Sequence, residues 1–435
     1  MQIWRRKRVR IACSTLILLA ALMGSTPLYA QDIAGDWQGT LKAGLDLRII
    51  VHIEKGTSGG WTAMLYSIDQ GPDGIPITSV TLKDSILKFS VELVHGAYEG
   101  KLSADAQTVT GTWTQRLPLP LELRRATKET AWQRDSSSHT AQFVSVDSNV
   151  KLEVLDWGGS GRPLVFLAGL GNTAHVFDTF APKFTRAHHV YGITRRGFGA
   201  SSVPDSGYSA DRLGDDVLAV LDALKINRPV LVGHSIAGEE LSSVGTRHPE
   251  KIAGLVYLDA AYPYAFYDPA LGDFNIDSLE LQKKLEQLRP GRAQADPKKL
   301  IQDVLQSLPR LEKDLQEELK DLEVEPANAR QVEAPAPAPA KAIIAGEQKY
   351  TEIRVPALAI YAVPHSGVPA AGNDAAARAA AEARDTISTG AQAKAFEKGV
   401  PTARVVRLPN ANHYVFRSNE ADVLRDMNAF LGSLP

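Results

Sequence analysis

One serine of the chain lies in a context that can make a hydroxyl nucleophilic. Residues 230–238 read VLVGHSIAG, in which an apolar strand enters a turn at Ser235 and a helix is expected to follow at once. This strand–turn–helix context is that of a nucleophile elbow, where a strained turn exposes the serine. Gly233 and Ala237 leave room for the turn. The strict motif has glycine at the position of Ala237, and this chain has Gly238 one residue later.

Three further motifs accompany the serine in the order of a known family. They are VLDWGGSG at residues 154–161, AGLG at residues 168–171 and TRRGFGAS at residues 194–201. Together they make residues 141–435 resemble an α/β-hydrolase-fold serine hydrolase of the esterase and lipase type. Two positions depart from the family pattern: Ala168 stands where a histidine is common, and Thr194 replaces an aspartate.

The resemblance implies the positions of the groups that work with Ser235. A serine hydroxyl needs an adjacent base. His413 follows the last expected strand, where the family carries its base; the alternative is a surface histidine in a turn. The resemblance also implies an oxyanion hole formed by the backbone N–H groups of Leu170 and Ile236.

The acid of the triad is the position at which the sequence departs most from the family. The family usually has a carboxylate after the strand at residues 358–363, but this chain continues with Pro-His-Ser-Gly. Asp259 ends the preceding strand, and Asp374 lies farther along the altered loop. Because the acid must orient the histidine and stabilise the imidazolium, proximity matters more than sequence position. We favour Asp259, because the end of a strand is held more rigidly than a long loop.

The elements around these residues predict an α/β fold. Apolar strands alternate with amphipathic helices, which indicates a mostly parallel, doubly wound sheet with helices on both faces. The helices are expected at residues 210–224, 236–247 and 421–431, and the strands at residues 163–167, 189–193, 229–232, 253–258, 356–361 and 403–408.

The alternation stops between the fourth and fifth of these strands. Residues 276–288 and 298–323 are charged and have helical periodicity, and the Pro/Ala-rich residues 332–340 are expected to be extended. We interpret residues 265–351 as a helical cap inserted into the hydrolase domain. The alternative is a surface excursion with no role at the site.

The N-terminal part has a different pattern. Residues 31–128 contain short strands rich in branched residues, separated by Gly/Pro/Asp turns, and predict a small all-β barrel or sandwich. We expect Trp37 and Trp113 to pack inside it rather than to stack on carbohydrate. The polar residues 129–140 are typical of a linker, so the hydrolase domain is expected at residues 141–435.

Residues 1–30 are typical of a secretory signal peptide. Five basic residues precede a short apolar run, and Ala30 ends the segment with a small side chain. The alternative is an uncleaved membrane anchor, although the apolar run is shorter than the roughly 20 residues of a bilayer span. Cleavage predicts a secreted or periplasmic protein with no stable membrane span.

Composition narrows the function classes. The chain of 435 residues is 44% hydrophobic and 23% charged, as in a soluble globular protein. Loss of the five basic residues of the signal moves the formal charge from −2 to −7, which argues against nucleic-acid binding. Cys13 also lies in the signal, so the mature chain has no thiol for catalysis, disulfides or zinc. The sequence contains no recognisable cofactor-binding motif. No clustered spacing of histidines and carboxylates indicates a metal site.

The sequence therefore predicts a secreted serine hydrolase that cleaves a small-molecule ester or amide through an acyl-enzyme, without a cofactor. Two alternatives remain open at this point. One is a non-catalytic binding protein on a hydrolase scaffold, suggested by the missing family acid. The other keeps catalysis but changes the reaction to cofactor-free C–C cleavage or perhydrolysis, because the fold hosts many chemistries.

Overall fold

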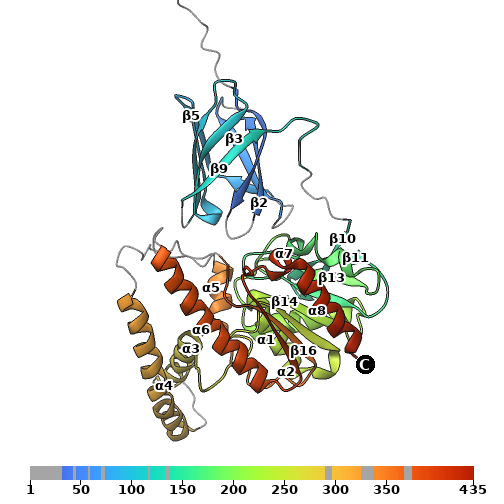
Figure 1. Cartoon of the computed structure of the whole chain (residues 1–435), viewed down its shortest axis with the longest axis vertical. Helices are drawn as coiled ribbons and strands as arrows, with labels where there is room; N and C mark the ends of the chain where they lie inside the picture. Colours follow the sequence, from blue (N-terminus) through green and yellow to red (C-terminus); the bar gives the residue numbers. More distant parts are fainter. Residues whose placement is uncertain are drawn as a thin grey trace, which may run out of the picture.

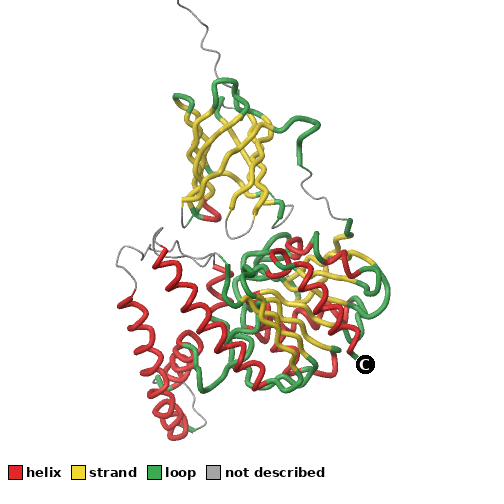
Figure 2. Tube along the Cα trace, viewed as in Figure 1, coloured by secondary structure: helices red, strands yellow, loops and turns green. Residues whose placement is uncertain are grey.

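The computed structural model of the chain describes residues 32–42, 46–56, 59–69, 74–115, 118–132, 138–289, 296–324, 338–366 and 375–435. The expected signal peptide, residues 1–30, and the alternative acid Asp374 lie outside the described residues. Within them the chain forms two sheets, one antiparallel and one mostly parallel (Figures 1 and 2).

The N-terminal sheet forms because apolar residues recur at every second position of its strands, as the pattern of buried and exposed residues shows. All neighbouring strands are antiparallel, in the order β4-β3-β2-β1-β9-β8-β7-β6-β5, and the sheet curls into a barrel in Figure 1. Trp37 and Trp113 are buried, which confirms that both pack inside. The strands are β1 (Gly35–Lys42), β2 (Asp46–Lys55), β3 (Trp61–Ser67), β4 (Ile75–Ile77), β5 (Ser79–Lys83), β6 (Ile86–Val91), β7 (Gly96–Leu102), β8 (Thr108–Thr114) and β9 (Pro118–Arg125).

The second sheet has the order β10-β11-β13-β12-β14-β15-β16-β17. Its first three strands pair antiparallel, and every pair from β13 onward is parallel. The central strands are buried along their whole length, because helices cover both faces. The strands are β10 (Thr140–Asp147), β11 (Val150–Gly158), β12 (Leu164–Leu167), β13 (Val190–Ile193), β14 (Val230–His234), β15 (Gly254–Leu258), β16 (Ala357–Ala362) and β17 (Ala403–Leu408).

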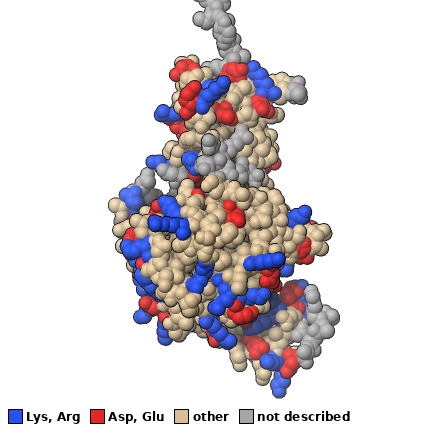
Figure 3. Space-filling model, turned by 90° about the vertical axis from the view of Figure 1, so that its right-hand side faces the viewer, with Lys and Arg blue, Asp and Glu red and all other residues tan. Residues whose placement is uncertain are grey.

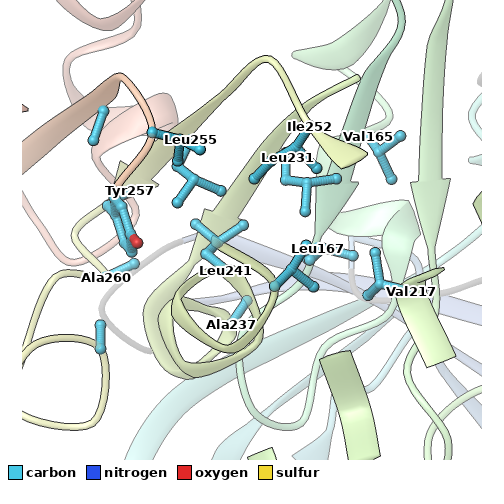
Figure 4. Close-up of a cluster of buried hydrophobic side chains, with 14 of the residues drawn as sticks. Val165, Leu167, Val217, Leu231, Ala237, Leu241, Ile252, Leu255, Tyr257 and Ala260 are labelled. Carbon is cyan, nitrogen blue, oxygen red and sulfur yellow. The ribbon is translucent and has the colours of Figure 1, made fainter. Parts of the chain in front are cut away.

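The helices divide between the two faces of this sheet. One apolar core contains Val217 of α1 and Leu241 of α2 (Figure 4). Phe396 of α6 belongs to the same core. The core on the other face contains Phe416 and Met427, contributed by α7 and α8. The helices are α1 (Ala210–Ala223), α2 (Gly238–Arg247), α6 (Ala375–Gly399), α7 (Val415–Ser418) and α8 (Glu420–Ser433). This arrangement confirms the predicted α/β fold with a separate antiparallel β sheet before it.

Three more helices lie between β15 and β16, in the segment interpreted as a cap: α3 (Phe274–Gln287), α4 (Pro297–Val324) and α5 (Ala338–Ile344). The extended conformation expected for residues 332–340 is wrong for residues 338–340, which begin α5. Pro339 lies in the first turn of that helix, where its missing N–H group costs nothing. The rest of the Pro/Ala-rich stretch lies outside the described residues.

Arg417 contacts both the N-terminal part and the hydrolase part of the chain. Arg417 in α7 donates from one guanidinium nitrogen to the Asp69 carbonyl of the N-terminal part and to the Val176 carbonyl of the hydrolase part. On the face in Figure 3, lysine and arginine side chains lie among aspartate and glutamate side chains. None of the described helices is both long enough and apolar enough to cross a bilayer.

Candidate active site

Ser235 lies at the turn between β14 and α2, as the motif predicts. Its φ of +55° is left-handed, a conformation that costs a serine on the order of 1–3 kcal/mol. The turn is tightly packed: a Cβ on Gly238 would lie 1.9 Å from the Ala260 carbonyl oxygen, and one on Gly233 would lie 2.9 Å from the Leu241 side chain. Position 238 therefore has no room for a side chain, whereas the turn accommodates the buried alanine at position 237.

Asp259 follows β15, the neighbouring strand, and is fully buried with a left-handed φ of +49°. One carboxylate oxygen accepts hydrogen bonds from the Ala362 backbone N–H at 2.9 Å and from the Tyr262 hydroxyl at 3.0 Å. The other oxygen lies 2.7 Å from His413 Nδ1 and 2.7 Å from His365 Nε2. Burial alone would raise the pKa of Asp259, but the hydrogen bonds from the two histidines hold that pKa well below its usual range. The carboxylate is thus ionised and saturated with donors.

His413 is placed by this carboxylate and by a second histidine. Because its Nδ1 bonds to Asp259, Nε2 is the ring nitrogen left for proton transfer. His234 Nε2 donates to the His413 carbonyl oxygen at 3.0 Å, and the two ring centroids are 4.7 Å apart. Burial lowers the pKa of His234 to about 3, so this ring is a neutral donor. The residue before Ser235 therefore ties the serine turn to the turn that carries His413.

Ser235 has a further neighbour that the sequence reasoning did not identify. The Tyr264 hydroxyl shares a hydrogen bond with the Ser235 hydroxyl. Burial raises the pKa of Tyr264 well above its usual value, so the phenol keeps its proton. The one indication of this contact in the sequence was the position of Tyr264 shortly after the strand that ends at Asp259.

Leu170 and Ile236 lie on the two sides of the serine turn. A Cβ on Gly169 would be 3.1 Å from Ser235 Cβ, so the loop that carries Leu170 runs directly against the nucleophile. Ile236 is in the first helical turn after Ser235, where backbone N–H groups have no acceptor within the helix. The Leu170 and Ile236 side chains pack in one apolar cluster with Ile343 of α5, which brings the inserted segment to the site.

Buried polar residues hold the loop before Leu170. Arg195 donates to the Glu240 carboxylate at 2.5 Å and to the Ala168 carbonyl at 2.8 Å. Thr194, which replaces the family aspartate, accepts from the Ala174 N–H at 3.0 Å and donates to Glu153 at 2.7 Å. The Thr194 hydroxyl is therefore paired both as a donor and as an acceptor in the place of the family aspartate.

His365 and Asp385 are site residues that the sequence reasoning missed. His365 occupies the loop after β16, where the family carries its acid. It bonds to Asp259 through Nε2 and to Asp385 through Nδ1 at 2.9 Å. Asp385 belongs to α6, a helix that the sequence reasoning did not predict. The only available signal was the histidine standing at the position of the expected carboxylate.

The doubly paired His365 predicts a pH effect on stability. Burial would lower the pKa of His365, but the hydrogen bonds and charges of Asp259 and Asp385 raise it to about 9. Since the unfolded value is about 6.5, the stabilisation is complete below that pH and is lost as the pH rises through about 9. The free energy of unfolding of the wild-type chain therefore falls between about pH 6.5 and about pH 9. In the His365→Gln variant we expect this fall to be smaller by on the order of 2–3 kcal/mol.

Urea unfolding of both proteins at several pH values measures this difference. His175, whose pKa is also raised to about 9 against the effect of burial, contributes equally to both proteins and cancels in the comparison. Parallel pH profiles for the wild-type chain and the His365→Gln variant would contradict the prediction.

Comparisons with known proteins match the hydrolase part of the chain. Residues 164–426 match the alpha/beta hydrolase family. A 2-hydroxymuconate semialdehyde hydrolase from Pseudomonas is 30% identical over 135 residues, covering 29% of this chain and 48% of that protein. A non-heme chloroperoxidase from Streptomyces lividans is 30% identical over 142 residues, covering 32% and 50%. The solved esterase from Exiguobacterium antarcticum has 17% identity and a TM-score of 0.45, covering 68% of this chain and 100% of that one. The chain spans about half the length of the curated relatives it matches.

Proposed function

Because the chain belongs to the alpha/beta hydrolase family, we propose that it is a serine hydrolase that cleaves an ester or amide bond of a small molecule through an acyl-enzyme. The observation that carries the proposal is the 2.7 Å contact between His413 Nδ1 and the ionised Asp259, beside the strained turn at Ser235. An ionised acid with this contact fixes the tautomer of the histidine and stabilises its imidazolium form.

Each residue then has one role in the reaction. The Ser235 oxygen attacks the substrate carbonyl carbon while His413 Nε2 takes the serine proton. The N–H groups of Leu170 and Ile236 donate to the oxyanion of the tetrahedral intermediate. His413 returns the proton to the leaving alcohol or amine, which leaves the acyl group on Ser235. Water, deprotonated by the same nitrogen, then releases the acid.

The names of the matched proteins support hydrolysis in general, but they do not agree on one substrate. One is named as a semialdehyde hydrolase and another as a chloroperoxidase, so C–C cleavage or perhydrolysis by the same residues is the second candidate function. The binding-protein alternative rested on the missing acid, and Asp259 supplies a carboxylate at the histidine. Labelling of the chain by a fluorophosphonate, together with turnover of a panel of p-nitrophenyl esters, tests the proposal. Absence of both results would contradict it.

We also propose that the protein is exported and works outside the cytoplasm. The support is the basic and apolar pattern of residues 1–30, with the small Ala30 at its end. N-terminal sequencing of the protein from a periplasmic or culture fraction is expected to begin at Gln31. An intact N-terminus in the membrane fraction would instead identify the segment as an anchor.

A further inference from the structure

A second cluster of histidine and carboxylate side chains lies apart from Ser235. His139 immediately precedes β10, and His175 and Asp178 lie in and just after the short helical turn Ala174–Phe177. We propose that these three side chains bind a divalent transition-metal ion, with zinc as the best match to two imidazoles and one carboxylate. No sequence motif predicts such a site, because only the fold brings His139 to the other two residues.

The distances between the donor atoms fit an ion at the centre of the cluster. His139 Nδ1 is 3.3 Å from one Asp178 oxygen, and His175 Nδ1 is 2.9 Å from the other. All the donor atoms lie within 4.8 Å of one another. Ligands about 2.0–2.1 Å from a tetrahedral zinc ion stand roughly 3.3 Å from each other, so the distances from the two histidines to Asp178 are close to this spacing.

Further residues hold these side chains in the orientation that a metal requires. The Trp157 indole N–H donates to Asp178 at 3.2 Å. On the far side of the His175 ring, Nε2 lies 3.6 Å from a Glu153 oxygen. The other Glu153 oxygen accepts from the Thr194 hydroxyl. A histidine that binds metal through one nitrogen and faces a carboxylate with the other is a common arrangement in metal proteins.

Burial favours a bound ion at this position. The side chains of His139, His175 and Asp178 are 5%, 3% and 17% exposed. Asp178 and Glu153 bring two carboxylates into this nearly dry space, and a divalent cation balances both charges. Zinc binds imidazole in its deprotonated form, so binding is expected to weaken as the pH falls.

Among the residues that the structure describes, the other group with suitable donor atoms is Asp259 with His365 and His413. Its donor atoms are already used. Both ring nitrogens of His365 bond to carboxylates, and each Asp259 oxygen takes two donors. An ion there would have to break all of these hydrogen bonds, whereas an ion among His139, His175 and Asp178 displaces the 2.9 Å hydrogen bond of His175 and the 3.3 Å contact of His139.

The test is zinc binding to the purified full chain after treatment with EDTA, with Cys13→Ser so that no thiol competes. Calorimetric titration with zinc sulfate should show one ion bound per chain. Thermal unfolding in the presence of zinc sulfate should show stabilisation. At saturation near 100 times the dissociation constant, Tm should rise by roughly 5–10 °C. Cobalt(II) should give the visible absorption spectrum of a four-coordinate site. Magnesium, which prefers oxygen ligands, serves as the control cation.

Variants assign the ion to its ligands. His139→Gln, His175→Ala and Asp178→Asn should abolish binding, and Glu153→Gln should weaken it by about 10–100-fold. His413→Ala and the surface variant His248→Gln should bind zinc as the wild-type chain does. His139 lies at the edge of the sheet, so its variant keeps the test decisive if His175→Ala does not fold.

Three results would overturn the proposal. The first is an EDTA-treated chain that takes up no zinc. The second is uptake that persists in all three ligand variants. The third is uptake lost only in His413→Ala, which would place the ion at Asp259. Because every readout is independent of turnover, the outcome is separate from that of the proposed hydrolase activity.

Discussion

Ser235→Ala is expected to abolish labelling by a fluorophosphonate and to lower kcat for any accepted ester by about 10⁶-fold. The hydroxyl is the only group in this arrangement that can form the acyl-enzyme. Removing it leaves the residual rate that the oxyanion donors and substrate binding provide. The substitution should not lower Tm, because alanine fits the space and only the hydrogen bond with Tyr264 is lost.

The matched control is Ser206→Ala, an exposed serine outside the site. It should label and turn over like the wild-type chain. Labelling that survives Ser235→Ala would show that another residue is the nucleophile. Equal kcat for the two alanine variants would show that the reaction does not pass through Ser235.

Asp259→Asn is expected to lower kcat by about 10⁴-fold with a much smaller change in KM. The amide has nearly the shape of the carboxylate but no charge, and its nitrogen cannot accept a hydrogen bond. His413 then loses both the partner that fixes its tautomer and the charge that stabilises the imidazolium. His365 loses the same partner, so its contribution to stability below pH 9 should fall as well.

Two further variants test whether the loss of kcat is specific to the Asp259 carboxylate or follows the removal of any nearby carboxylate. Asp374→Asn, the alternative acid in the sequence, should keep wild-type kcat. Asp385→Asn should reduce stability with a smaller loss of kcat than Asp259→Asn, because Asp385 reaches His413 only through His365 and Asp259. A large loss of kcat in Asp374→Asn and none in Asp259→Asn would show that we have assigned the wrong acid.

The parts of the fold with strong local periodicity were predictable from the sequence. The helix expected at residues 421–431 is α8, and the strand before Ser235 is β14. By contrast, α6 was missed because its alanine-rich sequence lacks a clear apolar stripe, so no helical periodicity marks it. The start of α5 was misjudged because proline suggests extended chain, whereas a proline in a first helical turn is compatible with a helix.

The site divides in the same way. Ser235 is predictable because the turn imposes local sequence requirements, and His413 follows from its position after the last strand. Choosing between Asp259 and Asp374 requires the distance from each carboxylate to His413, and the spacing of residues along the sequence does not give that distance. The contact of Asp259 with two histidines requires β15, β16 and β17 to be neighbours, and the partner of His365 comes from a helix that follows in the chain.

The left-handed backbones of Ser235 and Asp259 have an evolutionary consequence. Both residues end neighbouring parallel strands, and each would be relaxed by glycine, the residue that adopts positive φ without penalty. At position 235 a glycine would relieve the strain and remove the hydroxyl, whereas at position 259 it would also remove the acceptor of four hydrogen bonds. If the proposed function is correct, a lineage relieved of selection for turnover should replace Ser235 with glycine early while it keeps its core.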